Sequence, residues 1–244
     1  MSEPIDERSE NMAGGSPPRG IDELAALPAP SPPPIGGALE RELAAIRPIA
    51  TRRPVRQLAV LVGVSLIYGG GLVVVLSTRG DFHELPIAWL VGVAIAWLLG
   101  FAVPSYFALI PRSGSVTPRW QIAAIAAVIV AIGFVAFGLA IQRAGPSSVV
   151  YGIARFGRGH SCLEIGLATA LVPVVIGAVA LRGALPIGSR WIAAALGAGG
   201  GCLGGLVLHV HCNVVDPLHL GLIHGGVVIV AALVSAAIVP RTTA

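Results

Sequence analysis

The residues best suited to chemistry are concentrated in one stretch of the chain, residues 199–226. Most of the histidines, two of the three cysteines and one acid fall there: Cys202, His209, His211, Cys212, Asp216, His219 and His224. Thiolate and imidazole are the ligands that soft and borderline metal ions prefer, and two thiols in an oxidising space can instead form a disulfide. The stretch therefore predicts metal or thiol chemistry, although polar residues without reactivity at a membrane surface would give the same composition.

The composition places this stretch in a membrane protein. Hydrophobic residues make up 55% of the 244 residues and charged residues only 11%, and the mean hydropathy is +0.84. Soluble domains carry about 25% charged residues, so this chain has too few charges to cover an ordinary globular core. We expect lipid to solvate most of the chain, and the net charge of +4 gives no reason to expect direct nucleic-acid binding.

Six continuous apolar runs predict the elements that must position the reactive residues. They cover residues 57–76, 86–110, 121–141, 162–181, 191–210 and 218–239. Each is close to the roughly 20 residues with which a helix crosses the hydrocarbon, and none alternates as a barrel strand would. The predicted fold is an all-α membrane protein, with a bundle of six transmembrane helices over residues 57–240.

Two segments precede the bundle. Residues 1–35 are rich in Pro, Ser and Gly and predict a disordered tail, and their acidic start lacks the pattern of a cleaved signal peptide. Residues 36–56 predict a short cytosolic amphipathic helix with a basic flank, because Leu39, Leu43 and Ile46 recur at helical spacing. Such a helix could lie on the membrane surface or dock a cytosolic protein.

Arginine sets the predicted orientation. With the amino terminus in the cytoplasm, ten arginines flank the inner ends of the spans and four flank the outer ends. Basic residues are enriched on the cytoplasmic side, so both termini are predicted to lie there. The outer loop over residues 142–161 carries three of the four arginines, and the spacing of Val149, Ile153 and Phe156 predicts a small helix on the outer surface.

The apolar runs also predict how the helices pack. Small residues recur at every fourth position of the fifth run, at Gly197, Gly201 and Gly205, which favours a central helix that its neighbours approach closely. Cys202 lies about 15 Å deeper than Cys212 along that helix and is expected to be a packing residue. His224 is expected to form a hydrogen bond between helices. The near absence of charge inside the spans argues against an ion pathway.

This topology brings the reactive side chains to one membrane face. His160 and Cys162 lie where the fourth span begins, and Cys212 follows the fifth span at the same depth. The predicted metal ligands come from both places: His160, Cys162, His211, Cys212, Asp216 and His219. No resident cofactor is predicted, and a transient heavy-metal or zinc ion is the group that these ligands could take.

Several motifs resemble the NrsF-like family of bacterial membrane anti-sigma factors, which are negative regulators of a sigma factor of the extracytoplasmic-function type. The lead-in RELAAIRPIATRRPVRQL precedes six spans, GHSCLEIGL opens the fourth, and LHVHCNVVDPLHLGLIHGG covers the last hairpin. The family pattern at that hairpin pairs a cysteine with a following acid, proline and histidine, here Cys212, Asp216, Pro217 and His219 or His224. By motif, Cys162 and Cys212 correspond to the residues that the family is suspected to use for sensing.

The resemblance implies a stress-response regulator and no enzyme. Its lead-in, with Leu39, Leu43, Ile46 and Arg47, would hold a sigma factor at the cytoplasmic face of the bacterial inner membrane. Modification of the outer cysteines by metal or oxidant would then repack the bundle and release the sigma factor, which requires two bundle states of different affinity. The alternative is a membrane thiol oxidoreductase or metal-handling protein that uses the same cysteines and has no need of the residues before Arg56.

Reporter fusions can test the predicted topology. Fusions after Arg112, Arg182 and Arg241 should report the cytoplasm, because the arginines concentrate on that side. Fusions near Arg155 and Val214 should report the opposite side. A cytoplasmic signal at Val214 would contradict the placement of the cysteines on the outer face.

Overall fold

The computed structural model describes residues 36–37, 41, 53–111, 114, 116–141, 143–150, 159–182 and 189–243. The predicted tail and the predicted amphipathic helix, with Leu39, Leu43, Ile46 and Arg47, lie outside these residues. Ile153 and Phe156 of the predicted outer surface helix lie outside them too. Residues 52–244 form one compact unit, and the description below concerns this unit.

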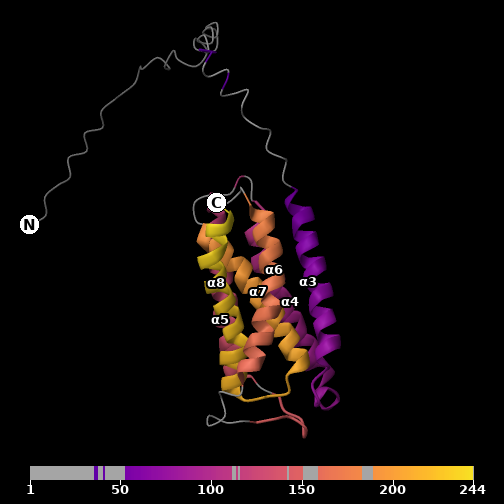
Figure 1. Cartoon of the computed structure of the whole chain (residues 1–244). Coiled ribbons are helices and arrows are strands. Elements are labelled where there is room, and N and C mark those ends of the chain that lie inside the picture. The colour runs from indigo at the N-terminus through magenta and orange to yellow at the C-terminus, as the bar shows by residue number, and fades with distance from the viewer. Residues whose placement is uncertain are drawn as a thin grey trace, which may run out of the picture. The chain divides into compact units, whose positions relative to one another are not determined.

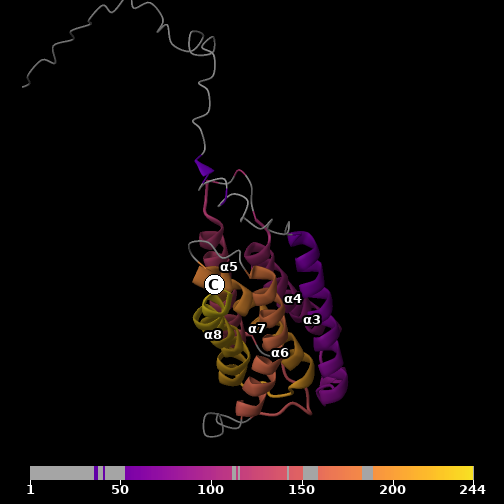
Figure 2. The ribbon, with the colours of Figure 1, turned by 45° about the horizontal axis from the view of Figure 1, so that its top comes forward.

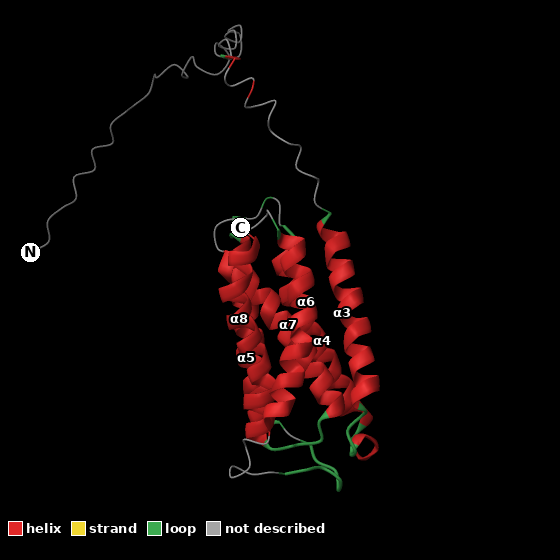
Figure 3. Cartoon of the chain, in the orientation of Figure 1, coloured by secondary structure: helices red, strands yellow, loops and turns green. Residues whose placement is uncertain are grey.

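Six helices in the described part of the chain are long and apolar enough to cross a membrane, by length and composition. They are α3 (Pro54–Leu76), α4 (Ile87–Leu109), α5 (Arg119–Ala140), α6 (His160–Leu181), α7 (Ser189–His211) and α8 (Gly225–Thr243), and α8 is preceded by the π-helical turn η3 (His219–His224). These helices confirm the six predicted runs. The described residues contain no β-strand, as Figure 3 shows.

The helices run alternately up and down in an antiparallel bundle (Figure 1). Helix α3 begins and α8 ends at one end of the bundle, while α6 begins and α7 ends at the other. Helix α7 lies among the other long helices (Figure 2) and packs against all five of them. In its most apolar 18 residues, 89% are buried. The fifth run is therefore the central helix, as its glycines predicted.

Glycines let the neighbours of α7 approach its backbone. A Cβ added at Gly200 would lie 2.9 Å from the carbonyl oxygen of Ala170 in α6, and one added at Gly201 would lie 2.6 Å from the Cα of Val228 in α8. A Cβ at Gly204 would meet the backbone of Gly166 in α6. Any larger side chain would separate these helices, so the glycines fix how closely α6 and α8 pack on α7.

The core lies around the middle of α7. The rings of Trp97 and Phe134 stack with centroids 3.7 Å apart, and a Cβ added at Gly100 would lie 2.6 Å from Phe134 Cε2. Cys202 is fully buried in this core cluster. It therefore belongs to the packing between α7 and its neighbours.

The loop before α6 differs from the prediction in its described part. Val149 is not helical but forms an isolated bridge with Val214: its N–H donates to Asn213 O at 3.0 Å, and its carbonyl accepts from Val215 N–H at 3.0 Å. Pro146 has no N–H to donate, and the Ser148 hydroxyl accepts from the Gly145 N–H at 2.7 Å. Such turn chemistry competes with a helix, so this part of the loop packs on the α7–α8 turn in an extended conformation.

Candidate functional site

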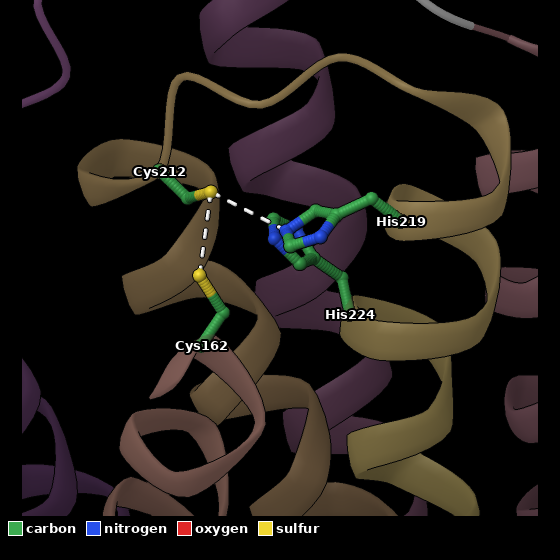
Figure 4. Close-up of side chains that lie close together, drawn as sticks. All are labelled: Cys162, Cys212, His219 and His224. Atoms are coloured by element: carbon green, nitrogen blue, oxygen red, sulfur yellow. Dashed lines mark hydrogen bonds between the residues drawn. The ribbon is translucent and has the colours of Figure 1, made fainter. Parts of the chain in front are cut away.

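Two cysteines from distant parts of the chain meet at the end of the bundle where α6 begins and α7 ends. Cys162 lies in the first turn of α6, and Cys212 directly follows α7. Their sulfur atoms are 3.5 Å apart, and both thiols are free (Figure 4). The antiparallel contact of α6 and α7 thus brings together the two cysteines that were predicted to share one depth.

Two histidines complete the cluster. His219 Nε2 lies 3.5 Å from Cys212 Sγ, and the rings of His219 and His224 have centroids 5.1 Å apart (Figure 4). One potential ligand atom from each of Cys162, Cys212, His219 and His224 lies within 4.8 Å of all the others. We call these four residues the Cys2His2 cluster. Sequence reasoning left His224 out of the predicted metal ligands but expected it to bond between helices, and its ring does bond to Cys212 at the end of α7.

The π-helical turn η3 explains why His224 joins. In an α-helix, side chains five residues apart point about 140° away from each other. In η3 the Gly225 N–H bonds to Leu220 O, the wider i to i+5 pattern of a π-helix, so residues five apart lie almost above one another. His219 and His224 therefore face the same sulfur. Two histidines five residues apart, shortly after a cysteine, were the sequence pattern that could have predicted this cluster.

Three of the predicted metal ligands lie outside the cluster. His160 is exposed in the first turn of α6, and His211 Nδ1 lies 3.0 Å from the carbonyl oxygen of Ser77. Asp216 is half-buried, and its backbone carbonyl accepts from the Leu220 N–H at 2.9 Å. His211 directly precedes Cys212, and consecutive side chains at a helix end point in different directions. Proximity in sequence therefore did not identify the residues that converge.

Hydrogen bonding favours the reactive form of Cys212. Cys212 is 6% exposed, His219 2% and His224 3%, while Cys162 is half-buried. The hydrogen bond from the Cys162 thiol lowers the pKa of Cys212; burial opposes this, and the contacts with His219 and His224 lower it further. A lowered thiol pKa favours the thiolate, which is the form that attacks oxidants and binds metals.

Each imidazole keeps one ring nitrogen without a hydrogen bond. His219 Nδ1 and His224 Nε2 are both buried, and neither has a hydrogen-bond partner within the described residues. A Cβ added at Gly159 would lie 2.8 Å from His219 Nδ1, so the loop before α6 leaves just enough room for this ring. A cavity of about 40 Å³ borders His224.

Comparison with known proteins identifies the chain. The family described as negative regulator of sigma F matches residues 43–244. The chain belongs to this family, NrsF. No curated protein and no solved structure matches it. Membership of NrsF confirms the resemblance noted in the motifs and implies negative regulation of a sigma factor, and the family is not known as an enzyme.

A buried ion pair fastens the turn that carries Cys212 in this NrsF chain. Arg79 is 6% exposed and Asp81 0%, and the guanidinium donates two hydrogen bonds to the carboxylate, one of them from Nη2 at 2.7 Å. The Arg79 backbone N–H donates to Val210 O at 2.9 Å, and the Ser148 hydroxyl donates to Asp81. The pair thus connects the α3–α4 loop with the end of α7 and with the loop before α6. Sequence reasoning missed it, because only the fold shows that these loop charges are buried.

The pH dependence of this ion pair follows from its surroundings. Burial raises the pKa of Asp81, but hydrogen bonds from Arg79 and Ser148 and the charge of Arg79 outweigh it and hold the pKa below the ordinary 3.8. A carboxyl whose pKa is lower in the folded state stabilises the fold above its unfolded pKa. The stabilisation is therefore present above about pH 3.8 and is lost as the pH falls through the lower folded pKa.

We expect Asp81→Asn to destabilise the NrsF chain strongly. The change leaves the Arg79 guanidinium buried without its counter-charge, and removing one partner of a buried pair costs about 3–5 kcal/mol. Glu84→Gln is the matched control, because Glu84 is exposed and accepts hydrogen bonds from Ser147 in the same region. Thermal unfolding of the protein in detergent at pH 7 should show a much larger fall in midpoint for Asp81→Asn. Equal shifts for the two variants would mean that the pair does not fasten the turn.

Proposed function

We propose that the chain is a multi-pass protein of the bacterial inner membrane that holds a sigma factor at the cytoplasmic face. It releases the sigma factor when Cys162 and Cys212 are modified by metal or oxidant on the opposite face. The observation that carries the proposal is the 3.5 Å separation of the two sulfurs in a chain whose family regulates a sigma factor negatively.

The family match supports the holding role. It begins at residue 43 and so includes Leu43, Ile46 and Arg47 of the predicted amphipathic lead-in together with the whole bundle. An apolar stripe on a helix can fill a groove on a partner protein. We assign Leu39, Leu43, Ile46 and Arg47 to the surface that contacts the sigma factor, which keeps it from RNA polymerase without any contact between this chain and nucleic acid.

The arrangement of the helices supports the sensing role. The cluster lies where α6 begins and α7 ends, and α3, which follows the lead-in, begins at the other end of the bundle. With both termini in the cytoplasm, as the arginines favour, the cysteines face the periplasm. Oxidising conditions there permit thiol chemistry that the cytoplasm suppresses.

A disulfide at the cysteines would supply part of the energy that a complete switch between two bundle states requires. A disulfide that closes a loop of about 50 residues is worth roughly 4 kcal/mol in the chain-entropy model, and a membrane bundle would gain less because its unfolded state is already restricted. Reversing a two-state equilibrium from 1:99 to 99:1 takes about 5.5 kcal/mol. Modification of the pair therefore shifts the bundle substantially, provided that the two states differ in their affinity for the sigma factor.

Replacing Leu43 and Ile46 together by Asp should release the genes controlled by the sigma factor. Burying a carboxylate in an apolar groove is unfavourable by several kcal/mol unless it is paired, so the lead-in would lose its partner. Transcription of a target-gene reporter measures the release, and immunoblots of membranes should show unchanged protein levels.

The matched control places the same two charges in the tail. Leu24→Asp combined with Leu27→Asp adds two carboxylates before the family match, which begins at residue 43, and should leave repression intact. Full repression by the Leu43 and Ile46 double variant would show that the lead-in does not hold the sigma factor.

Cys162→Ser and Cys212→Ser should each abolish the response to metal or oxidant as completely as the double variant. The two sulfurs form one contact, so the loss of either removes the reacting unit. Reporter induction after exposure to cadmium or to a thiol oxidant measures the response. Cys202→Ser serves as the control, because Cys202 is buried in the core and lies outside the cluster. Additive partial losses, or a full response from the double variant, would exclude the pair as the sensor.

A further inference from the structure

We infer that Cys162, Cys212, His219 and His224 form a tetrahedral binding site for one thiophilic divalent cation of the zinc and cadmium class. The inference deepens the proposed function by naming the ligand of the sensing end and all four of its contacts. It concerns binding alone, so it can be tested without a sigma factor.

The distances already match a tetrahedron. An ion with bonds of about 2.3 Å to sulfur and about 2.0 Å to nitrogen separates two sulfur ligands by about 3.8 Å and a sulfur and a nitrogen ligand by about 3.6 Å. The two sulfurs lie 3.5 Å apart, and Cys212 Sγ lies 3.5 Å from His219 Nε2. All four ligand atoms lie within 4.8 Å of one another, so small rotations of the side chains would close the remaining edges.

The combined charge of the four ligands and the ion suits a buried site. Two thiolates neutralise a divalent cation, and two neutral imidazoles complete the coordination without adding charge. The complex is then neutral overall, which matters because burying a net charge without compensation is costly. His219 and His224 are 2% and 3% exposed, so the site lies away from solvent.

The two buried histidines favour a metal over a disulfide as the group for which this site is built. A disulfide would involve only the two sulfurs and would give the two imidazole rings no role. The site instead brings both rings to one sulfur through the π-helical turn, an uncommon feature that is often found at functional sites. Apart from their contacts with Cys212, the rings make no other bond that would explain their burial, because His219 Nδ1 and His224 Nε2 have no hydrogen-bond partner among the described residues.

The site has one accessible side. Cys162 is half-buried, whereas the other three residues are buried. An ion therefore reaches the Cys162 sulfur first. Binding forms two sulfur–metal bonds and breaks the S–H bonds that the cysteines carry; the protons leave to solvent, and no electron is transferred.

Cobalt(II) is the probe that tests the geometry. Full-length protein without a histidine tag, reduced and purified in detergent, should bind one Co²⁺ per chain and show the intense visible d–d bands of a tetrahedral site together with thiolate-to-cobalt absorption. Zn²⁺ or Cd²⁺ should displace it. His219→Gln and His224→Gln should each weaken binding by more than the about 10- to 100-fold that is typical of changes beyond the coordinating residues.

Matched variants separate the cluster from its neighbours. His211→Gln and His160→Gln change histidines near the cysteines that lie outside the cluster, and both should bind Co²⁺ like the parent. Circular dichroism checks that every variant remains helical, and Gln keeps a polar side chain of similar size in the buried positions. Cys162→Ser and Cys212→Ser should lose the thiolate-to-cobalt absorption in part.

Three results would overturn the inference: no tetrahedral spectrum in the parent, unchanged affinity in His219→Gln and His224→Gln, or loss of binding in His211→Gln. Dependence on the two cysteines alone would identify a dithiol pair and not a four-ligand site. Metal binding is scored on purified protein, whereas release of the sigma factor is scored by a reporter in cells. A chain that binds Co²⁺ as expected but fails to repress would contradict the proposed function and leave the metal site standing.

Discussion

The site depends on the close packing of α6 against α7. Gly204 meets the backbone of Gly166, and Gly200 meets the carbonyl of Ala170, so the two helices touch without intervening side chains. Cys162 begins the first of these helices and Cys212 follows the second. A Cβ at Gly204 would collide with the carbonyl oxygen of Gly166, so a side chain there would push the helices apart and alter the separation of the two sulfurs. The glycines of α7 therefore set the geometry of the cluster from within the bundle.

Helix α7 is also the element through which the two ends of the bundle can influence each other. It packs against every other long helix and is almost wholly buried, so no neighbour can move without changing a contact with it. Close-packed interiors adopt discrete arrangements and do not deform continuously. In the proposed switch, a change at the cluster would reach the opposite end as a repacking of helices on α7. The ion pair of Arg79 and Asp81 limits which repackings are open, since it fastens the turn after α7 to two loops.

The sequence predicted the helices well and the site only in part. Continuous apolar runs of span length have few alternatives, so the six helices and the central place of the fifth could be derived from residues 57–240 alone. The pairing of Cys162 with Cys212 followed from antiparallel order. His224 was missed because its role depends on a local π-helical turn, which α-helical spacing excludes, and His211 was included because it is close in sequence. The buried pair of Arg79 and Asp81 was missed because charged residues in a loop are expected to be exposed to solvent, and only the fold shows that these two are buried.

The π-helical turn links the cluster to the packing of α8 by its register. One extra residue in a turn rotates everything beyond it by about 100° relative to an uninterrupted helix. The face of α8 that packs inward carries Val227, Val228, Ala231, Ser235 and Val239, all buried and distributed along the length of the helix. The backbone of Val228 packs directly against Gly201 only in this register. The number of residues in η3 that brings His224 to Cys212 therefore also decides which face of α8 packs against α7. A change in η3 would alter the packing of α8 along its whole length, as far as the end of the bundle where α3 begins.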